Sequence, residues 1–288
     1  IRGVYGTDLT DETAYLIGKG LGTFFQDNGQ NKVVVGRDNR ISGQAVFANF
    51  TKGLLETGCS VVNLGIVLTP FLYFSWYELD ANACAMITAS HNPAQYNGFK
   101  CSLNKKPLLG DDYQKIKAIC VSGIFKSGTG TLSQFNLWPA FKEKIKSSIS
   151  LPKKLKVALD CGNGTASLFA QELLTELGCE VLPIFCTSDG TFPNHQPYPQ
   201  KVELYGKLVE TIRNNRADIG LSFDGDGDRL GIYDEKGNFV ENDRLAMIFA
   251  SDICKKHSGI KVVMNVSTSL SVIDFINKNG GDFIIERT

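Results

Sequence analysis

An internal repeat constrains the fold of this chain more than any other sequence feature. Three segments begin with a short apolar run that ends in a polar turn, followed by a helix-like stretch, a glycine and a second apolar run. Because glycine is the residue that most often ends a helix, each copy reads as strand, helix, strand. Such units pair their strands in parallel and pack helices on the sheet. The first runs cover 32–38, 156–162 and 261–267, and the glycines are Gly58, Gly178 and Gly280.

The repeat predicts the fold class: an α/β protein of tandem three-layer α/β/α domains with mixed, mostly parallel sheets. The polar segment KSSISLPKK marks a boundary near residue 150. We therefore expect domains at 1–150 and 151–240, with residues 241–288 as part of a third domain.

The elements between the repeats are predicted from their apolar patterns. A strand is expected at 83–88 and a helix at 111–121, and the Gly/Ser/Thr-rich stretch 122–133 is typical of a loop. In the later units we expect strands at 219–223 and 230–233 and a helix at 242–256.

Charge and hydropathy argue against several classes of partner. The 288 residues contain 30 Lys+Arg and 30 Asp+Glu, and a zero net charge does not favour nucleic acid or an anionic membrane. No apolar run approaches the ~18 residues that span a bilayer. The first residues lack signal-peptide character and an initiator Met, so we expect the chain to begin inside a longer protein. Eight cysteines without a C-x-x-C pair predict buried free thiols in a reducing cytoplasm.

An acidic loop follows the expected strand at 219–223. It contains Asp224, Asp226 and Asp228 with a glycine between each pair, and Arg229 comes next. The glycines let the backbone curl so that all three carboxylates face one point. A divalent cation at that point would offset their repulsion, and oxygen-only ligands favour Mg²⁺, Mn²⁺ or Ca²⁺. Arg229 could hold an anion beside the metal.

Two other interpretations of this loop stay open. Asp-Gly is a common turn dipeptide, so the loop could be a solvated hairpin turn. A strand that ends in D-x-D also resembles the haloacid dehalogenase superfamily, in which Asp224 would be a nucleophile. An EF-hand does not fit, because Arg229 stands where that loop needs glycine and strands flank it.

A second loop, Ala89 to Lys100, follows the strand at 83–88. Ser90 lies at a strand's carboxyl end, where α/β proteins place their chemistry. Two turns, at Asn92-Pro93 and Asn97-Gly98, could bring Lys100 back towards Ser90. A serine beside His91 suggests hydrolase chemistry, but no G-x-S-x-G elbow is present. A loop of local turns without chemistry is the other alternative.

The two loops together point to phosphoryl transfer. A phosphate on Ser90 would add nearly two negative charges and three acceptor oxygens. One oxygen could complete the shell of Mg²⁺, and Arg229 could neutralise another. Phosphoryl transfer depends mainly on positioning and charge neutralisation, which these parts supply.

At this point the sequence resembles the α-D-phosphohexomutase superfamily, specifically its phosphomannomutase/phosphoglucomutase branch. The resemblance extends over essentially the whole chain. Its most specific motifs are TASHNP (88–93), YNGFK (96–100) and FDGDGDR (223–229), and IRG (1–3), GRDNR (36–40) and FPNHQPYP (192–199) agree as well.

The resemblance implies a role for each matching residue. Ser90 would be the phosphoserine, and Asp224, Asp226 and Asp228 would hold one Mg²⁺ together with its phosphate. The other roles implied are phosphate contact by Arg229, acid–base work at the sugar hydroxyl by Lys100 with a lowered pKa, assistance by His91, and substrate binding by Arg2, Arg37 and Lys100.

The implied reaction interconverts hexose 1-phosphate and hexose 6-phosphate through a bound hexose 1,6-bisphosphate, which would also act as activator. The family has four domains, so the resemblance implies that C-terminal domains are missing and that this chain turns over substrate poorly. Two alternatives remain: a Mg²⁺-dependent phosphatase that uses Asp224, and a non-catalytic metal or sugar-phosphate binding module. Mannose, glucose and glucosamine phosphates are not distinguished.

Overall fold

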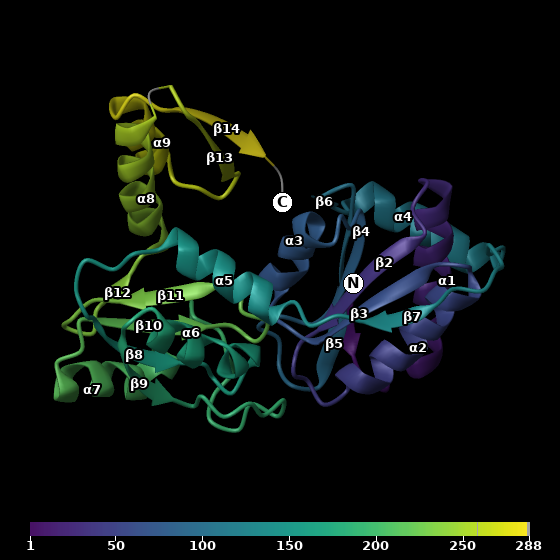
Figure 1. Cartoon of the computed structure of the whole chain (residues 1–288), viewed down its shortest axis with the longest axis horizontal. Helices are drawn as coiled ribbons and strands as arrows, with labels where there is room; N and C mark the ends of the chain where they lie inside the picture. Colours follow the sequence, from purple (N-terminus) through teal and green to yellow (C-terminus); the bar gives the residue numbers. More distant parts are fainter. Residues whose placement is uncertain (258, 287–288) are drawn as a thin grey trace.

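The computed structural model describes residues 1–257 and 259–286 and arranges them in three α/β parts (Figure 1). Each part has its own sheet. The first and second parts lie side by side, and the third, with α8, α9, β13 and β14, stands against the second. No helix in these described ranges is long and apolar enough to cross a membrane.

The sheet of the first part is mixed. Its order is β1-β5-β4-β2-β3-β7, with β6 paired to β5. Strands β4, β2, β3 and β7 run parallel to one another, whereas β5 runs antiparallel to β4, β1 and β6. In sheet order the bounds are Arg2–Val4 (β1), Tyr96–Leu103 (β5), Ala83–Ile87 (β4), Lys32–Arg37 (β2), Ser60–Ile66 (β3) and Leu132–Gln134 (β7), and β6 is Lys106–Pro107.

Helices cover both faces of this sheet, which explains why every residue of β4 is buried. On one face α1 (Asp11–Asp27), α2 (Gly43–Glu56) and α4 (Gly110–Ser122) enclose a core centred on residues such as Phe25 and Phe50. The first two helices cross closely at glycines, since a Cβ on Gly18 would lie 2.2 Å from the Phe50 carbonyl oxygen.

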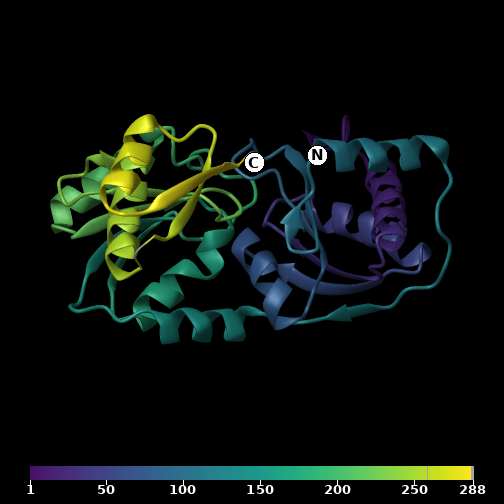
Figure 2. The same ribbon diagram turned by 90° about the horizontal axis from the view of Figure 1, so that it is seen from above.

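The opposite face carries α3 (Thr69–Glu78) and α5 (Trp138–Ser148). In Figure 2 the extended segment with β7 returns along one edge of the molecule from α4 to α5. Helix α5 packs against both parts, because its Phe141 ring lies 4.2 Å from Phe71 of α3 and its Lys142 pairs with Glu172 of the second part. The rings of Phe71 and Phe169 are 4.8 Å apart and join the two parts as well.

The second part repeats the layered arrangement on a smaller scale. Its sheet order is β12-β11-β10-β8-β9, with β8 parallel to β9 and β10, and β11 antiparallel to β10 and β12. The bounds are Lys156–Asp160 (β8), Glu180–Ile184 (β9), Ile219–Phe223 (β10), Leu230–Tyr233 (β11) and Phe239–Val240 (β12), with helices α6 (Ala170–Glu176) and α7 (Gly206–Asn215) and short 3₁₀ helices η1 (Thr165–Leu168) and η2 (Val202–Tyr205).

The third part is one strand-helix-strand unit preceded by a helix. Strands β13 (Lys261–Asn265) and β14 (Asp282–Glu286) pair in parallel, and α8 (Asn242–Lys256) and α9 (Leu270–Lys278) enclose a small core with them. Several large apolar side chains of this part remain exposed, among them Phe249 and Leu270.

The predicted fold class and the repeat are confirmed. The three glycines expected after the helices all have positive φ, +95°, +91° and +77° at Gly58, Gly178 and Gly280. The loop expected at 122–133 is wrong at its end, because β7 begins at Leu132 and pairs with β3. All three β7 residues are exposed at the sheet edge, so no apolar alternation marked them as a strand. The domain boundaries at 150 and 240 stay a prediction.

Candidate active site

The serine loop, residues 88–95, lies at the carboxyl end of β4, as expected. Ser90 is fully buried and has a φ of +55°, in the left-handed region that non-glycine residues rarely adopt. Its N–H donates to the Thr88 hydroxyl over 2.8 Å, and that hydroxyl donates to Asp38 over 2.7 Å. The surrounding contacts thus hold the backbone of Ser90 in a strained conformation.

Arg40 is the residue that fixes this loop, and the sequence reasoning assigned it no role. Its guanidinium is fully buried and donates to the carbonyl oxygens of three loop residues and of Tyr96, the first residue of β5. The acceptors are Ser90 at 2.8 Å, Asn92 at 2.7 Å, Pro93 at 2.6 Å and Tyr96 at 3.0 Å. Asp38 balances the charge, with 3.0 Å between Arg40 Nε and its Oδ2. The GRDNR segment therefore contributes a scaffold for the serine loop.

The aspartate loop, residues 224–229, follows β10 and meets the serine loop across the boundary between the two parts. The Ser90 hydroxyl donates to Asp224 Oδ2 over 2.6 Å. A Cβ on Gly225 would lie 2.4 Å from the Ser90 carbonyl oxygen, so this approach requires glycine. The two loops that the sequence places 134 residues apart thus form one site.

The three carboxylates converge as the sequence predicts, with ligand atoms within 4.8 Å of one another. Asp224 and Asp226 are fully buried. Burial, followed by the charges of Asp226 and Asp228, raises the pKa of Asp224 to about 7. Three carboxylates this close together repel one another, and a bound cation would relieve that repulsion.

Lys100 supplies part of the compensating charge. Its ammonium lies 2.6 Å from Asp226 Oδ2 and also pairs with Asp228. Burial opposes its charge, but the two carboxylates outweigh burial and raise the pKa of Lys100. The expected lowered pKa is therefore wrong for this structure, because the nearest groups are anions rather than cations. Burial likewise opposes ionisation of Asp226, yet Lys100 lowers the pKa of Asp226.

One oxygen of the cluster lacks a partner in the described part of the chain. Asp226 Oδ1 is buried and accepts no hydrogen bond, whereas Asp226 Oδ2 accepts from the Thr69 hydroxyl over 2.6 Å. An orphaned buried carboxylate oxygen is costly unless a cation or water satisfies it. Three oxygen ligands and this orphan fit a hard divalent cation.

His91 and Arg229 lie at the mouth of the site. Arg229 Nη1 is 2.9 Å from His91 Nδ1, which is also 3.3 Å from the Ser90 hydroxyl. Burial and then the Arg229 charge lower the pKa of His91 to about 4, so the imidazole is neutral at neutral pH. The backbone N–H of Arg229 donates to Asp224 Oδ1 over 3.1 Å.

The two remaining predicted residues are less closely joined to the cluster. Arg2 is exposed and donates to the Asn92 side chain over 3.3 Å, at the edge of the serine loop. Arg37 ends β2 and donates to Gln44 over 3.0 Å. Among the described residues, neither has a hydrogen bond or ion pair to the three carboxylates. Burial lowers the pKa of Arg37.

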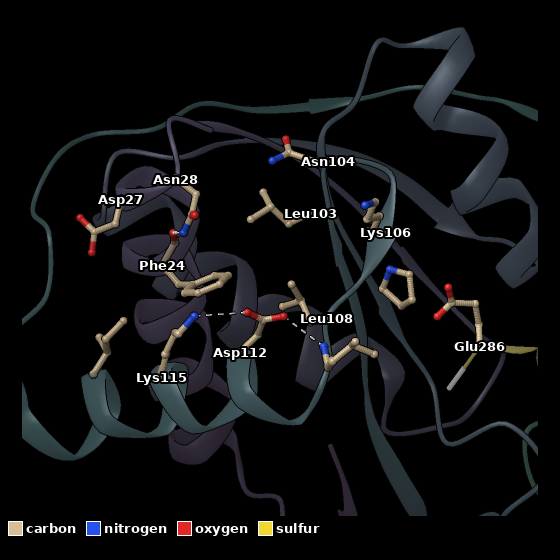
Figure 3. Close-up of a pocket in the computed structure, with 13 residues that line it drawn as sticks. Phe24, Asp27, Asn28, Leu103, Asn104, Lys106, Leu108, Asp112, Lys115 and Glu286 are labelled. Atoms are coloured by element: carbon tan, nitrogen blue, oxygen red, sulfur yellow. Dashed lines mark hydrogen bonds and ion pairs between the residues drawn. The ribbon is translucent and has the colours of Figure 1, made fainter. Parts of the chain in front are cut away.

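A cavity of about 1000 Å³ lies apart from this site (Figure 3). Residues of α1, the β5–β6 hairpin and α4 line it, and Glu286 of β14 approaches from the third part. Lys115 and Asp112, one turn apart on α4, form an ion pair at 3.8 Å in its lining. Its lining contains none of the predicted site residues.

Comparison with known proteins identifies the family of this chain. Residues 1–126 match the family model of phosphoglucomutase/phosphomannomutase alpha/beta/alpha domain I. Residues 139–237 match the model of alpha/beta/alpha domain II of the same family. The chain belongs to this family. As those names indicate, the two matched stretches are layered α/β units, and in this chain each contributes one loop to the site.

Several relatives match this chain over its full length. The chain is 38% identical over 288 residues to the phosphomannomutase/phosphoglucomutase of Pseudomonas aeruginosa and covers 62% of that protein. It is 33% identical to the phosphoglucomutase/phosphomannomutase of Thermococcus kodakarensis and covers 67% of it. A family structure from Burkholderia thailandensis superposes with a TM-score of 0.96 at 34% identity, over all of this chain and 65% of that one. The chain thus spans about two thirds of the length of these relatives.

The family match leaves unexplained a second set of residues that the sequence reasoning missed. Asn39, between Asp38 and Arg40, donates from its side chain to the Asn163 carbonyl at 2.7 Å and the Ser188 hydroxyl at 2.9 Å in the second part. These contacts, together with the meeting of the two loops, form what we call the seam. The GRDNR motif contains Asn39, but nothing in the motif indicates that Asn39 contacts the second part of the molecule.

The segment 192–199 docks on the same seam. The Gln196 side chain donates to the His91 carbonyl oxygen, and the Tyr198 ring lies 4.3 Å from the His91 ring. His195 anchors the segment, because its Nε2 is 3.2 Å from Asp160 and its Nδ1 is 3.0 Å from the Gln196 carbonyl oxygen. The FPNHQPYP motif therefore positions His91 from the second part.

Proposed function

We propose that this chain carries out the phosphoryl-transfer step of a phosphohexomutase, interconverting hexose 1-phosphate and hexose 6-phosphate through phosphorylated Ser90. The observation that carries the proposal is the 2.6 Å hydrogen bond from the buried Ser90 hydroxyl to Asp224, across the seam. A serine held against a carboxylate cluster suits a phosphate bound through a shared cation.

The carboxylates of Asp224, Asp226 and Asp228 would hold one Mg²⁺, with the Ser90 oxygen as a further ligand. When bound, the ion supplies positive charge that neutralises the phosphoryl oxygens. The orphaned Asp226 Oδ1 and the oxygen-only donor set support this assignment.

The other residues bind, orient and move protons. Arg40 holds the backbone carbonyl of Ser90 in place, and Arg229 beside His91 offers donors to phosphate oxygens. When phospho-Ser90 transfers its group, the sugar hydroxyl loses a proton and Ser90 Oγ gains one, so the protonation balances. Lys100 Nζ, close to Asp226 and Asp228, would hold a proton at the sugar hydroxyl, and Arg2 and Arg37 would bind substrate phosphate.

The remaining proposals concern the whole protein. We propose that a hexose 1,6-bisphosphate serves as intermediate and activator, that domains equivalent to the rest of the relatives' length complete the substrate site, and that the protein is cytoplasmic. Eight free cysteines suit a reducing compartment. Because the chain spans 62% of its Pseudomonas relative, the test below targets the transfer step rather than the complete cycle.

The test compares Ser90→Ala with the exposed-serine control Ser122→Ala. Each variant is incubated with Mg²⁺, a hexose 1,6-bisphosphate and a labelled hexose monophosphate, and phosphoryl exchange and free phosphate are both measured. We expect Ser90→Ala to lose exchange by about 10⁴-fold or more, as for the loss of a nucleophile, and the control to keep it. Phosphate release that survives Ser90→Ala and disappears in Asp224→Asn would favour the phosphatase instead.

A further inference from the structure

Two cysteines that are distant in the sequence meet in the second part of the molecule. Cys161 follows β8 and Cys186 follows β9, and their sulfur atoms are 3.2 Å apart. The parallel pairing explains this, because Asp160 stands opposite Ile184 and the two chain ends leave the sheet together. Their spacing along the chain gives no indication that Cys161 and Cys186 are in contact.

The two cysteines differ in their exposure to solvent and in the environment of their thiols. Cys161 is fully buried, whereas Cys186 is partly exposed. Contact with Cys161 lowers the pKa of Cys186, although burial and the nearby Asp160 oppose the thiolate. A partly exposed cysteine beside a buried one is the arrangement of an attacking and a resolving thiol.

The pair also borders the seam. Asn163, two residues after Cys161, donates its side-chain N–H to the Thr187 carbonyl oxygen over 2.8 Å. Ser188, two residues after Cys186, accepts from Asn39 of the first part over 2.9 Å. A bond between the two sulfurs would therefore tie together the two turns that hold Asn39.

We propose that Cys161 and Cys186 form a reversible thiol–disulfide modification site with hydroperoxide as its oxidant. The Cys186 sulfur attacks the peroxide, the O–O bond breaks, and Cys186 becomes a sulfenic acid as water leaves. The Cys161 sulfur then displaces the hydroxyl group, which leaves as water with the Cys161 proton. In total two thiols and one hydrogen peroxide give one disulfide and two waters. The sulfurs approach by about 1 Å to reach bonding distance of about 2.05 Å.

Cys179 provides a matched internal control. It is closer to Cys186 in the sequence, but it precedes β9 whereas Cys186 follows it. At about 3.3 Å per strand residue, the two lie about 20 Å apart. Random oxidation of an unfolded chain would link Cys179 to Cys186 at least as readily as Cys161.

The experiment treats the folded chain with a small excess of hydrogen peroxide, blocks remaining thiols by alkylation and digests with trypsin and a glutamate-specific protease. Trypsin alone leaves all three cysteines in one peptide, but cleavage after Glu172, Glu176 and Glu180 separates them. We expect a linked pair of peptides that contain Cys161 and Cys186, a loss of two free thiols, and recovery of both by a dithiol reductant.

The variants sharpen the result. Cys179→Ser should form the same link, and Cys186→Ser should form none. The peptide map of the wild-type chain tests the proposal by itself, even if a variant fails to fold. A folded wild-type chain whose Cys186 is oxidised to sulfinic acid without a link, or a Cys179–Cys186 link, would overturn the proposal. The readout is chemical, so it does not depend on the proposed phosphoryl transfer.

Discussion

The serine loop and the aspartate loop face each other but are held in different ways. The carbonyl oxygens of the serine loop converge on the single buried guanidinium of Arg40, and Asp38 balances its charge. The aspartate loop gathers three carboxylates, and within the described residues one of its buried oxygens accepts no hydrogen bond. Hydrogen bonds from the protein thus hold the serine loop, whereas we propose that a cation completes the aspartate loop. The backbone of Ser90 would then be fixed before the cation binds.

The largest expected effect is on the serine loop. Arg40→Met removes the donor to four carbonyls and leaves the buried Asp38 unpaired, so we expect a loss of about 3–5 kcal/mol in the free energy of unfolding. Urea and thermal unfolding measure it. Arg37→Met is the matched control, because Arg37 lies three residues earlier and donates to Gln44 alone among the residues described. Equal stability of the two variants would contradict a special role of Arg40.

A smaller effect is expected on the aspartate loop, and it should depend on metal. Asp226→Asn keeps the shape of the side chain but removes the charge of one proposed metal ligand. Loss of a residue that only supports a metal ligand typically lowers metal affinity by roughly 10–100-fold, so we expect Mg²⁺ affinity to fall by more than this. Calorimetric titration with Mg²⁺ alone measures it.

The control for this titration is Asp234→Asn, at the other end of the same hairpin, where Asp234 bonds its own turn. Unchanged Mg²⁺ affinity in Asp226→Asn, or an equal loss in the control, would place the cation elsewhere.

The smallest expected effect concerns segment 192–199, which docks on the serine loop. Both ring nitrogens of His195 face acceptors, which suits the doubly protonated imidazole. Burial opposes that charge, but Asp160 outweighs it and raises the pKa of His195. The stabilisation is therefore complete below the ordinary pKa of about 6.5 and is lost as pH rises through the raised value.

His195→Gln should accordingly lose about 1–2 kcal/mol of stability near pH 5.5 and progressively less as the pH rises above 7. Unfolding curves across this range measure the difference. His257→Gln, at an exposed position after α8, serves as the control. A deficit that grows with pH would show that the neutral imidazole makes the stabilising contact.

Local motifs made much of this structure predictable from the sequence. Strands β10 and β11 and helix α8 begin and end at the expected residues, because apolar runs bounded by glycine or charge define them. The convergence of Asp224, Asp226 and Asp228 was predictable for the same reason, since the glycines between them act over a few residues.

Contacts between distant residues were not predictable in the same way. Nothing in the pattern distinguishes Arg40, which is fully buried, from Arg37, which is not, because the acceptors lie fifty or more residues away. The same holds for His195 with Asp160 and for Cys161 with Cys186. The pKa of Lys100 was predicted in the wrong direction because its sign depends on which charges lie nearest in space.

If the two loops form one phosphoryl-transfer site, a phosphate should be found on Ser90, and mapping its position is the decisive experiment. The chain and its Asp226→Asn variant are incubated with Mg²⁺ and a hexose 1,6-bisphosphate, and peptides are analysed by mass spectrometry with and without hydroxylamine, which removes acyl phosphate but not phosphoserine. We expect one hydroxylamine-stable phosphate on Ser90 in the wild-type chain and little in the variant. A hydroxylamine-labile phosphate on Asp224, or equal labelling of Ser90 in both proteins, would contradict it.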